Sequence, residues 1–311
     1  MMKSIPVLAV EGRTLAEGYE RALIALYDEG IPMHTQYDKP DDPPSVDATL
    51  NLTVHEPWSD PMIHKAFPGG IEDLREYLFE LGGRKDHWVK NMNDPDDTRW
   101  EYTYHQRLAD WGTWFEKDET GRRFKTSVTS GAGGDGVDQV RAVIDKLTAS
   151  PHTRQAQMIT WMPFMDFDVY DPPCLQSIWY RLTEGDGRYY LNCNVRFRSN
   201  DAWGANFMNM FGFTLFNKTI IARALEERIG KPVELARLNW QADSYHLYGK
   251  DQADFRSRFW DRLGSTVFED RVFHFHDDLI REIWNEAEAA VLKKIADYEA
   301  STGNTATTGD V

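Results

Sequence analysis

The sequence predicts a single domain of the α/β class, taken broadly to include α+β arrangements, over residues 1–300. The chain has 311 residues, which is long enough to bury a large core. Its composition, 41% hydrophobic and 13% aromatic, is that of a globular protein. Helices and short strands alternate before Pro151 and strand patterns dominate after it, without an internal repeat or a clear linker. These observations favour one mixed domain.

Helical and extended patterns alternate in the first half of the chain. Apolar residues at 3.6 spacing follow Thr14 and stop before Gly30, as in an amphipathic helix. The expected elements are a strand over 5–10, a helix over 14–29, a loop over 36–46, a strand over 47–56, a helix over 71–82, weakly structured stretches over 91–99 and 118–136, and a helix over 137–148.

Strand patterns dominate after Pro151. Gly185-Asp186-Gly187 separates two of them and predicts a hairpin. The expected elements are strands over 155–163, 176–182 and 188–197, a long helix over 207–229, a strand over 233–241, and a helix over 277–299 with Leu279, Ile280, Ile283, Trp284, Val291, Leu292 and Ile295 on one face. Residues 301–311 are rich in Gly, Thr and Ser and are expected to form a disordered tail.

Charge and composition exclude several classes of function. The formal net charge of −15 argues against binding a nucleic acid polymer, which needs a basic face. Two cysteines provide no disulfide framework and indicate a reducing compartment. No run approaches the roughly 18 apolar residues of a membrane helix, and no secretory pattern is present. We expect a cytoplasmic protein, of a cell or of a phage in its host. No metal is expected, because His274-Phe275-His276 lacks an identifiable third ligand.

Three stretches carry candidate chemistry. Cys174 follows Pro172-Pro173, and the arginines at 154, 181, 196 and 198 are expected to lower the pKa of its thiol, although a lone cysteine is more often a buried apolar residue. Glu76 and Glu80 lie one turn apart on a mostly apolar helix, and the sequence does not separate a solvated glutamate from a buried acid. The glycines of 131–136 precede a helix but lack a Lys-Ser/Thr pair, so a flexible connector is favoured over a phosphate loop.

Four blocks in the right order resemble the thymidylate synthase family over residues 70–250. The strongest is Pro172-Pro173-Cys174, followed by Arg198-Ser199-Asn200-Asp201 and by Asn209, eleven residues after Arg198. The other blocks are Glu76 through Gly82, Gly136 through Trp161 with Pro151-His152-Thr153-Arg154, and His246-Leu247-Tyr248. The resemblance implies a thymidylate synthase-like fold, in which helices pack on a mixed sheet and one sheet face forms a homodimer interface.

The resemblance also implies substrates and site residues. A pyrimidine nucleoside monophosphate would react with 5,10-methylenetetrahydrofolate, so the partners include tetrahydrofolate, and Cys174 would add at C6 so that C5 attacks the methylene carbon. The catalytic residues would be Cys174, Glu76, which organises water, Tyr104, which moves protons, and Asp201, whose amide contacts the base. The substrate-binding residues would be Arg198, Ser199 and Arg154 for the phosphate, Asn209 for the base, and His246 and Tyr248 for the sugar.

Departures from the family pattern refine the expected reaction. Gln155 replaces the second of two phosphate-binding arginines, and Lys39, Arg107 and Arg181 are possible substitutes. The tryptophan segment and the C-terminal lid that exclude water in the synthases are missing. A weaker barrier would let water, instead of hydride, capture the C5 methylene, which predicts a 5-hydroxymethyl product. The alternative is a divergent synthase that makes dTMP.

Base choice and other classes of function stay open. The Asn209 amide can pair with uracil and, when flipped, with cytosine. The resemblance implies Asp at this position in dCMP hydroxymethylases, so Asn209 makes dUMP the first choice and dCMP or CMP the second. An inactive nucleotide-binding relative and an unrelated cysteine hydrolase are the remaining alternatives. A hydrolase needs a histidine paired with Cys174, and no motif nominates one.

Overall fold

A mixed seven-stranded sheet forms the centre of the computed structural model, which describes residues 4–305. The strand order is β1-β3-β11-β10-β9-β8, with β2 added to β3. β1 pairs with β3 and β10 with β11 in parallel, and the other pairs are antiparallel. The strands are β1 (Val7–Gly12), β2 (Ile31–Met33), β3 (Ser45–Val54), β8 (Ala156–Ile159), β9 (Leu175–Gly185), β10 (Arg188–Asp201) and β11 (Val233–Leu247). The predicted class and mixed sheet are confirmed.

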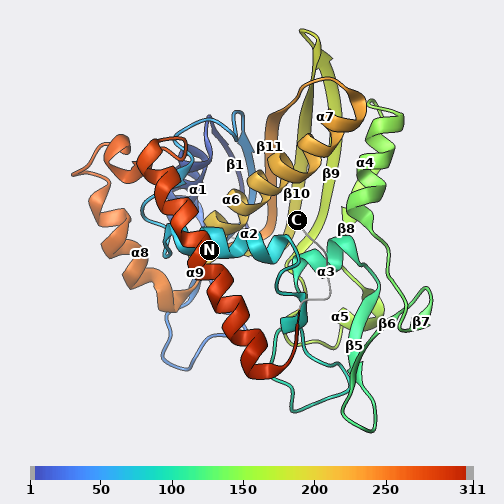
Figure 1. Cartoon of the computed structure of the whole chain (residues 1–311). Helices are drawn as coiled ribbons and strands as arrows, with labels where there is room; N and C mark the ends of the chain where they lie inside the picture. The colour runs from blue at the N-terminus through green and yellow to red at the C-terminus, as the bar shows by residue number, and fades with distance from the viewer. Residues whose placement is uncertain (1–3, 306–311) are drawn as a thin grey trace.

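Helices cover one face of this sheet in successive layers (Figure 1). α6 and α7 pass across β10 and β11, α2 packs on α6, and α9 packs on α2. Phe197 of β10 and Phe213 of α6 both pack on Trp240 of β11, in the buried layer between sheet and helices. The main helices are α1 (Leu15–Glu29), α2 (Ile71–Leu81), α4 (Gln139–Ala149), α6 (Asn206–Phe216), α7 (Arg223–Ile229) and α9 (Asp278–Thr302).

Local signals placed several of these elements well. The helices expected over 14–29, 71–82 and 137–148 are present as α1, α2 and α4, within two residues at each end. The predicted hairpin joins β9 to β10 through Asp186 and Gly187, which both have positive φ, at 52° and 76°. Such a two-residue turn matches the twist of the strands that it joins.

The long helix expected over 207–229 is interrupted by a π-helical segment, Asn217–Ala222. The Asn217 side chain faces the sheet there, where it accepts a hydrogen bond from the Tyr180 hydroxyl at 2.8 Å and donates to the Cys193 sulfur at 3.4 Å. A wider turn lets one polar side chain reach these buried partners without ending the helix. Cys193 is therefore a core residue, and burial raises its pKa to about 12.

Several elements were not predicted. The stretch 118–136, expected to be weakly structured, contains most of a small sheet of β5 (Thr113–Lys117), β6 (Arg123–Ser127) and β7 (Gly131–Ala132). Also missed were β4 (Ile63–His64), α3 (Tyr104–Ala109), α5 (Pro163–Asp166), α8 (Gln252–Arg258) and β12 (Val272–Phe273). These short elements have too few residues to show a period.

The C-terminal helix α9 buries a narrower stripe than predicted. Ile280, Trp284, Val291 and Ile295 are buried, whereas Leu279, Ile283 and Leu292 are exposed, because a single helical face cannot include both sets. Of the tail predicted over 301–311, the first two residues end α9, and residues 306–311 lie outside the described part of the chain. Within residues 4–305, no helix has the length and hydropathy needed to cross a membrane.

Candidate active site

Cys174 lies immediately before β9, where the chain leaves the rigid Pro172-Pro173 pair. Its carbonyl accepts a hydrogen bond from the backbone N–H of Arg198 at 2.8 Å. The Arg198 Nε donates to the Pro173 carbonyl at 3.1 Å, and its Nη2 lies 3.7 Å from the Cys174 sulfur. Two neighbouring strands therefore hold the sulfur and the guanidinium side by side.

The thiol of Cys174 is not activated in the free protein. Burial raises its pKa, the Arg198 charge opposes the rise without cancelling it, and the carboxylates of Asp171 and Asp201 add to it. The expectation that nearby arginines lower this pKa was therefore wrong in its net direction. Among the described residues, the cation that acts on the sulfur is Arg198, and desolvation of a thiolate outweighs its attraction.

A cavity of about 410 Å³ opens beside the sulfur and is called the thiol cavity below. Four predicted site residues meet in its wall, and Lys250, which no motif indicated, joins them with its Nζ 5.2 Å from the centre of the Tyr248 ring. The cavity is lined by Tyr37, Asp38, Asp42, Tyr170, Asp171, Cys174, Arg198, Ser199, Tyr248, Gly249 and Lys250. Its volume suits a ligand of nucleotide size.

The His246 ring contacts Tyr248 and Ser244, and one of its nitrogens has no hydrogen-bond partner among the described residues. The ring packs on Tyr248 with a centroid distance of 4.6 Å, and its Nδ1 lies 3.2 Å from the Ser244 hydroxyl. That hydroxyl donates to the Asp47 carboxylate at 2.7 Å. Burial lowers the pKa of His246, so the ring is neutral near pH 7. Its buried Nε2 has no hydrogen-bond partner among the described residues, which suits it to a ligand hydroxyl.

Asp201 and Asn209 lie on either side of the turn that leads from β10 into α6. Asp201 Oδ1 accepts hydrogen bonds from the backbone N–H groups of Trp203 at 3.0 Å and Gly204 at 2.9 Å. A Cβ at position 204 would lie 2.5 Å from Asp201 Oδ2, so a larger residue there would push against this carboxylate. The Asn209 side chain is buried, and its Oδ1 accepts a hydrogen bond from the Tyr77 hydroxyl of α2 at 2.5 Å.

Glu76 lies in a second cavity of about 340 Å³, called the carboxylate cavity below. Its carboxylate accepts hydrogen bonds from Lys85 and from the Lys294 Nζ, which is 2.8 Å from each oxygen. Burial alone would raise the pKa of Glu76, but the hydrogen bonds from Lys294 and Lys85 outweigh burial and lower it. Glu76 is therefore ionised between two cations, of which Lys294 comes from α9 and was not predicted.

Glu80 lines the same cavity one helical turn after Glu76. Burial raises the pKa of Glu80 to about 7, and its carboxyl forms no hydrogen bond or ion pair within residues 4–305. The two glutamates thus have opposite character: one is a paired carboxylate, and the other is a carboxyl close to its protonation point near neutral pH. The choice of Glu76 as the catalytic glutamate stays a prediction.

Aromatic side chains form the other wall of the carboxylate cavity. Trp100, Trp203 and Phe207 line it, and the Lys85 Nζ lies 5.3 Å from the centre of the Trp100 ring. Trp88 packs on Trp100 at a centroid distance of 5.2 Å. The segment 84–104, which lacks the family's tryptophan motif, therefore still supplies an indole to the wall. Flat apolar walls and a few charged groups suit a large heteroaromatic ligand.

The hydroxyls of two tyrosines, Tyr102 and Tyr104, contact the backbone at Cys174 and Leu175. The Tyr104 hydroxyl accepts a hydrogen bond from the backbone N–H of Leu175 at 3.3 Å, and that of Tyr102 accepts from Cys174 at 3.4 Å. Burial raises the pKa of both, so both hydroxyls stay protonated. Tyr104 was predicted as the proton-transfer tyrosine. Tyr102 was missed, and the structure places its hydroxyl at the backbone of the predicted nucleophile, Cys174.

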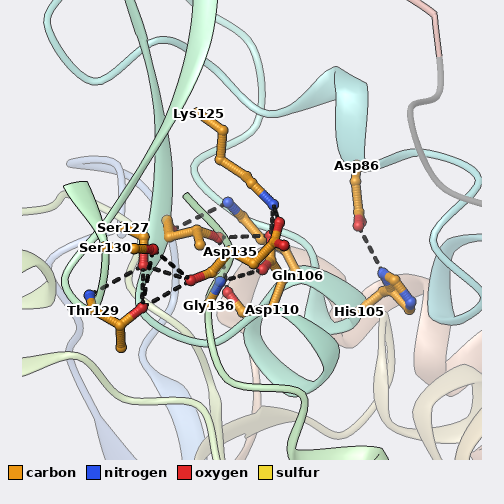
Figure 2. A network of polar contacts seen from close by, with 11 residues as sticks. Asp86, His105, Gln106, Asp110, Lys125, Ser127, Thr129, Ser130, Asp135 and Gly136 are labelled. Atoms are coloured by element: carbon orange, nitrogen blue, oxygen red, sulfur yellow. Dashed lines mark hydrogen bonds and ion pairs between the residues drawn. The ribbon is translucent and has the colours of Figure 1, made fainter. Parts of the chain in front are cut away.

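A polar network holds α3, the short helix that begins at Tyr104 (Figure 2). Asp86 lies 2.6 Å from His105 Nδ1 at one end. At the other end, Asp110 accepts hydrogen bonds from the Lys125 Nζ at 2.9 Å and from the backbone N–H of Gly136 at 2.7 Å. The hydroxyls of Ser127, Thr129 and Ser130 all donate to the Asp135 carbonyl. The glycine-rich stretch 131–136, expected to be a flexible connector, is thus tied down by side chains.

The structure does not bring Arg107 or Arg154 to the thiol cavity. The Arg107 guanidinium is buried in a two-bond ion pair with Asp166, at 2.8 and 3.0 Å. The Arg154 side chain is exposed ahead of β8, and its carbonyl accepts a hydrogen bond from Trp179 Nε1 at 3.0 Å. Arg107 would have to leave its ion pair to bind a phosphate. The predicted roles of both arginines stay predictions.

Comparisons with known proteins identify the family. The thymidylate synthase family matches residues 74–273, from α2 to β12. A "Putative thymidylate synthase" of Methanosarcina acetivorans is 28% identical over 218 residues, which cover 70% of this chain and 76% of that protein. Its counterpart in Methanosarcina mazei is 30% identical over the same shares. A "Deoxyuridylate hydroxymethyltransferase" of Bacillus phage SP01 is 34% identical over 189 residues, 57% of this chain and 43% of that protein.

The fold and the match over most of the chain define a one-carbon transferase of nucleotide biosynthesis. The chain belongs to the thymidylate synthase family. The family binds a pyrimidine nucleotide and a folate. The predicted family is therefore confirmed, and the matched span contains every predicted site residue from Glu76 to Tyr248.

Proposed function

We propose that this protein transfers a hydroxymethyl group to C5 of a pyrimidine nucleoside monophosphate, with dUMP as the preferred substrate and 5,10-methylenetetrahydrofolate as the one-carbon donor. The observation that carries the proposal is the position of the Cys174 sulfur, in the wall of a cavity of nucleotide size and 3.7 Å from the Arg198 guanidinium. A nucleophile and an anion-binding group on one wall are what covalent chemistry on a nucleotide requires.

The nucleotide would be held at three points. Arg198 and Ser199 bind the phosphate, and Lys250 is the described cation best placed to replace the arginine missing at Gln155. His246 and Tyr248 bind the sugar, because the buried Nε2 of His246 has no hydrogen-bond partner within residues 4–305. The Asn209 amide binds the edge of the base. In a homodimer, Arg154 of the partner subunit completes the phosphate site.

Cys174 in the thiol cavity, Glu76 in the carboxylate cavity and the two tyrosines beside Cys174 would then carry out the covalent steps. The Cys174 sulfur bonds to C6 and loses its proton, which leaves a nucleophilic carbon at C5. C5 would then bond to the donor's methylene carbon as the bond from that carbon to one folate nitrogen breaks, and the bond to the second nitrogen would break as the C5 proton leaves, which releases tetrahydrofolate. The C5 proton leaves through water organised by Glu76 and the hydroxyls of Tyr104 and Tyr102. Water adds to the methylene on C5, and the bond between sulfur and C6 breaks to return the thiolate.

The carboxylate cavity would bind the folate. Trp100, Trp203 and Phe207 offer flat apolar surfaces for a fused aromatic ring, and Lys85 with Lys294 offers donors for its polar edge. When bound, the folate supplies the one-carbon unit. The ionised Glu76 and the carboxyl of Glu80 keep this cavity polar, which supports the retention of water near the reacting carbon.

The proposal specifies a product, the 5-hydroxymethyl nucleotide, and a base, uracil. The similarity to the phage protein named deoxyuridylate hydroxymethyltransferase supports both. The archaeal relatives named for thymidylate synthase favour the second candidate, a divergent synthase that makes dTMP. Asn209 is compatible with uracil and, in the flipped orientation, with the cytosine of dCMP or CMP.

A homodimer in the reducing cytoplasm is also part of the proposal. Along β10, Cys193, Val195 and Phe197 are buried against the helices, whereas Asn194 and Arg196 point to the opposite face of the sheet. A second copy on that face would bring Arg154 close to its partner's site. Both cysteines are free in the structure, as a reducing compartment requires.

Release of tritium from C5 tests the function directly. The labelled substrates are dUMP, dCMP, UMP and CMP, each with methylenetetrahydrofolate, and each product is weighed by mass spectrometry. We expect release from dUMP with a gain of CH2O. A gain of CH2 with formation of dihydrofolate would make the protein a thymidylate synthase, and no release from any substrate would refute catalysis. Cys174→Ser is the control, and we expect it to bind dUMP but to lose release by at least about a thousandfold.

A further inference from the structure

Tyr77 and Asn209 form a buried hydrogen bond that links two helices. Tyr77 lies on α2 and Asn209 on α6, and the phenol oxygen is 2.5 Å from Asn209 Oδ1. The two side chains are 9% and 8% exposed, so the bond is shielded from water. A shielded bond holds its geometry more firmly than a solvated one because water does not compete for either group.

The bond sets the direction of the Asn209 amide. Hydrogen bonds from a hydroxyl to an oxygen range from about 2.5 to 3.0 Å, and those that involve an amide N–H are longer, so 2.5 Å indicates the oxygen of the amide at Tyr77. Burial raises the pKa of the Tyr77 phenol, which therefore stays protonated and donates. The amide NH2 group of Asn209 consequently points away from Tyr77.

The α6 helix is shaped to admit the Tyr77 ring. Gly212 lies one turn after Asn209, and a Cβ at position 212 would be 2.5 Å from Tyr77 Cδ1 and 2.6 Å from Cε1. Non-bonded carbon atoms do not approach each other this closely, so any larger residue at position 212 would displace the Tyr77 ring. The absence of a side chain at 212 is therefore what lets the phenol reach Asn209.

We propose that Tyr77 is a specificity-determining residue, which selects the pyrimidine by fixing the orientation of the Asn209 amide. The inference rests on the proposed function, in which Asn209 contacts the base. Uracil presents an acceptor, O4, beside a donor, N3–H, and cytosine presents a donor beside an acceptor. An amide that is free to turn matches both bases. An amide held by Tyr77 presents its donor and acceptor in one order and matches one base.

The test is the ratio of the affinities for dUMP and dCMP, measured by calorimetry on the full-length protein and repeated as a ratio of kcat/KM. We expect Tyr77→Phe to lower the wild-type preference about five- to tenfold, the range of one lost hydrogen bond. Tyr19→Phe is the matched control, because the buried Tyr19 hydroxyl has no hydrogen-bond partner in the described part of the chain. We expect Tyr19→Phe to keep the wild-type ratio.

Each outcome decides the inference. An unchanged ratio in Tyr77→Phe, or an equal loss in Tyr19→Phe, would overturn it while leaving the proposed reaction in place. A changed ratio without tritium release from wild type would overturn the reaction and keep the role of Tyr77. If Tyr77→Phe does not fold, Gly212→Ala shifts the ring while it keeps the phenol, and the same loss of preference is expected.

Discussion

Glu80 lies in the carboxylate cavity, and its surroundings change its pKa strongly. Burial raises its pKa to about 7, whereas its helix neighbour Glu76 is held ionised by two lysines. A carboxyl of this kind is protonated below neutral pH and carries a charge above it. The free energy of unfolding therefore falls as pH rises from about 4.5 to about 7. In this range the unfolded chain has already released the proton and the folded chain still holds it.

We predict that Glu80→Gln flattens the pH dependence of stability. The folded pKa lies above the ordinary value of 4.5, so the stability contributed by the protonated group is complete below about pH 4.5 and is lost as pH rises to about 7. The loss in the wild type amounts to about 3 kcal/mol at most. Urea unfolding at about pH 5 and about pH 8 measures it. Parallel pH profiles for wild type and variant would contradict the shift.

At the scale of elements, α9 brings Lys294 to the site from 218 residues beyond Glu76 in the sequence. The helix packs on α2, and Trp284 packs on Phe211 of α6 at a centroid distance of 5.8 Å. From this position Lys294 reaches Glu76. The C-terminal helix therefore acts on the charge of the predicted catalytic glutamate.

We predict that Lys294→Met moves the acidic limb of the kcat/KM profile to higher pH. Removing one of the two lysine hydrogen bonds raises the pKa of Glu76, because burial then meets less opposition. The control is Lys293→Met, since Lys293 is exposed and pairs with Asp297 of its own helix. A profile unchanged by Lys294→Met, or shifted equally by both variants, would show that α9 does not tune Glu76.

At the scale of the whole molecule, the proposed homodimer would complete the site. Arg154 is exposed ahead of β8, outside the described residues that line the thiol cavity, and Asn194 and Arg196 of β10 lie on the sheet face opposite the buried side chains of this strand. A two-fold dimer across that face would make each thiol cavity depend on the partner's Arg154. Each of the two sites would then be composite.

We predict that mixing two inactive variants restores activity. In a hybrid of Cys174→Ser with Arg154→Ala, one site has both defects and the other has an intact Cys174 and an intact partner Arg154. Random exchange of subunits makes about half of the dimers hybrid, so activity should return to about a quarter of the wild-type value. If Arg154 serves its own chain, mixing restores nothing, and the sedimentation velocity of each variant checks that dimers form.

Part of the fold and part of the candidate site could be predicted from the sequence alone. Helical period and turn chemistry placed α1, α2, α4 and the β9–β10 hairpin, because each signal acts within a few residues. The same locality explains why Cys174, Arg198 and Ser199 were found: they belong to motifs of contiguous residues, and adjacent strands carry them to one wall. The mixed sheet followed from the family resemblance and not from periodicity, and the order of its seven strands was not predicted.

The tertiary structure alone decided which distant side chains meet. Lys294 contacts Glu76 across 218 positions, and Tyr77 contacts Asn209 across 132. No local pattern marks such pairs, since they depend on how α9, α2 and α6 pack in space. Packing also decided the state of Cys174, whose pKa rises with burial despite the adjacent Arg198. The sequence by itself determined the family and several long elements and predicted the nucleophile. The three-dimensional arrangement determined the charge and orientation of the groups around Cys174, because desolvation and long-range contacts exist only once the chain has folded.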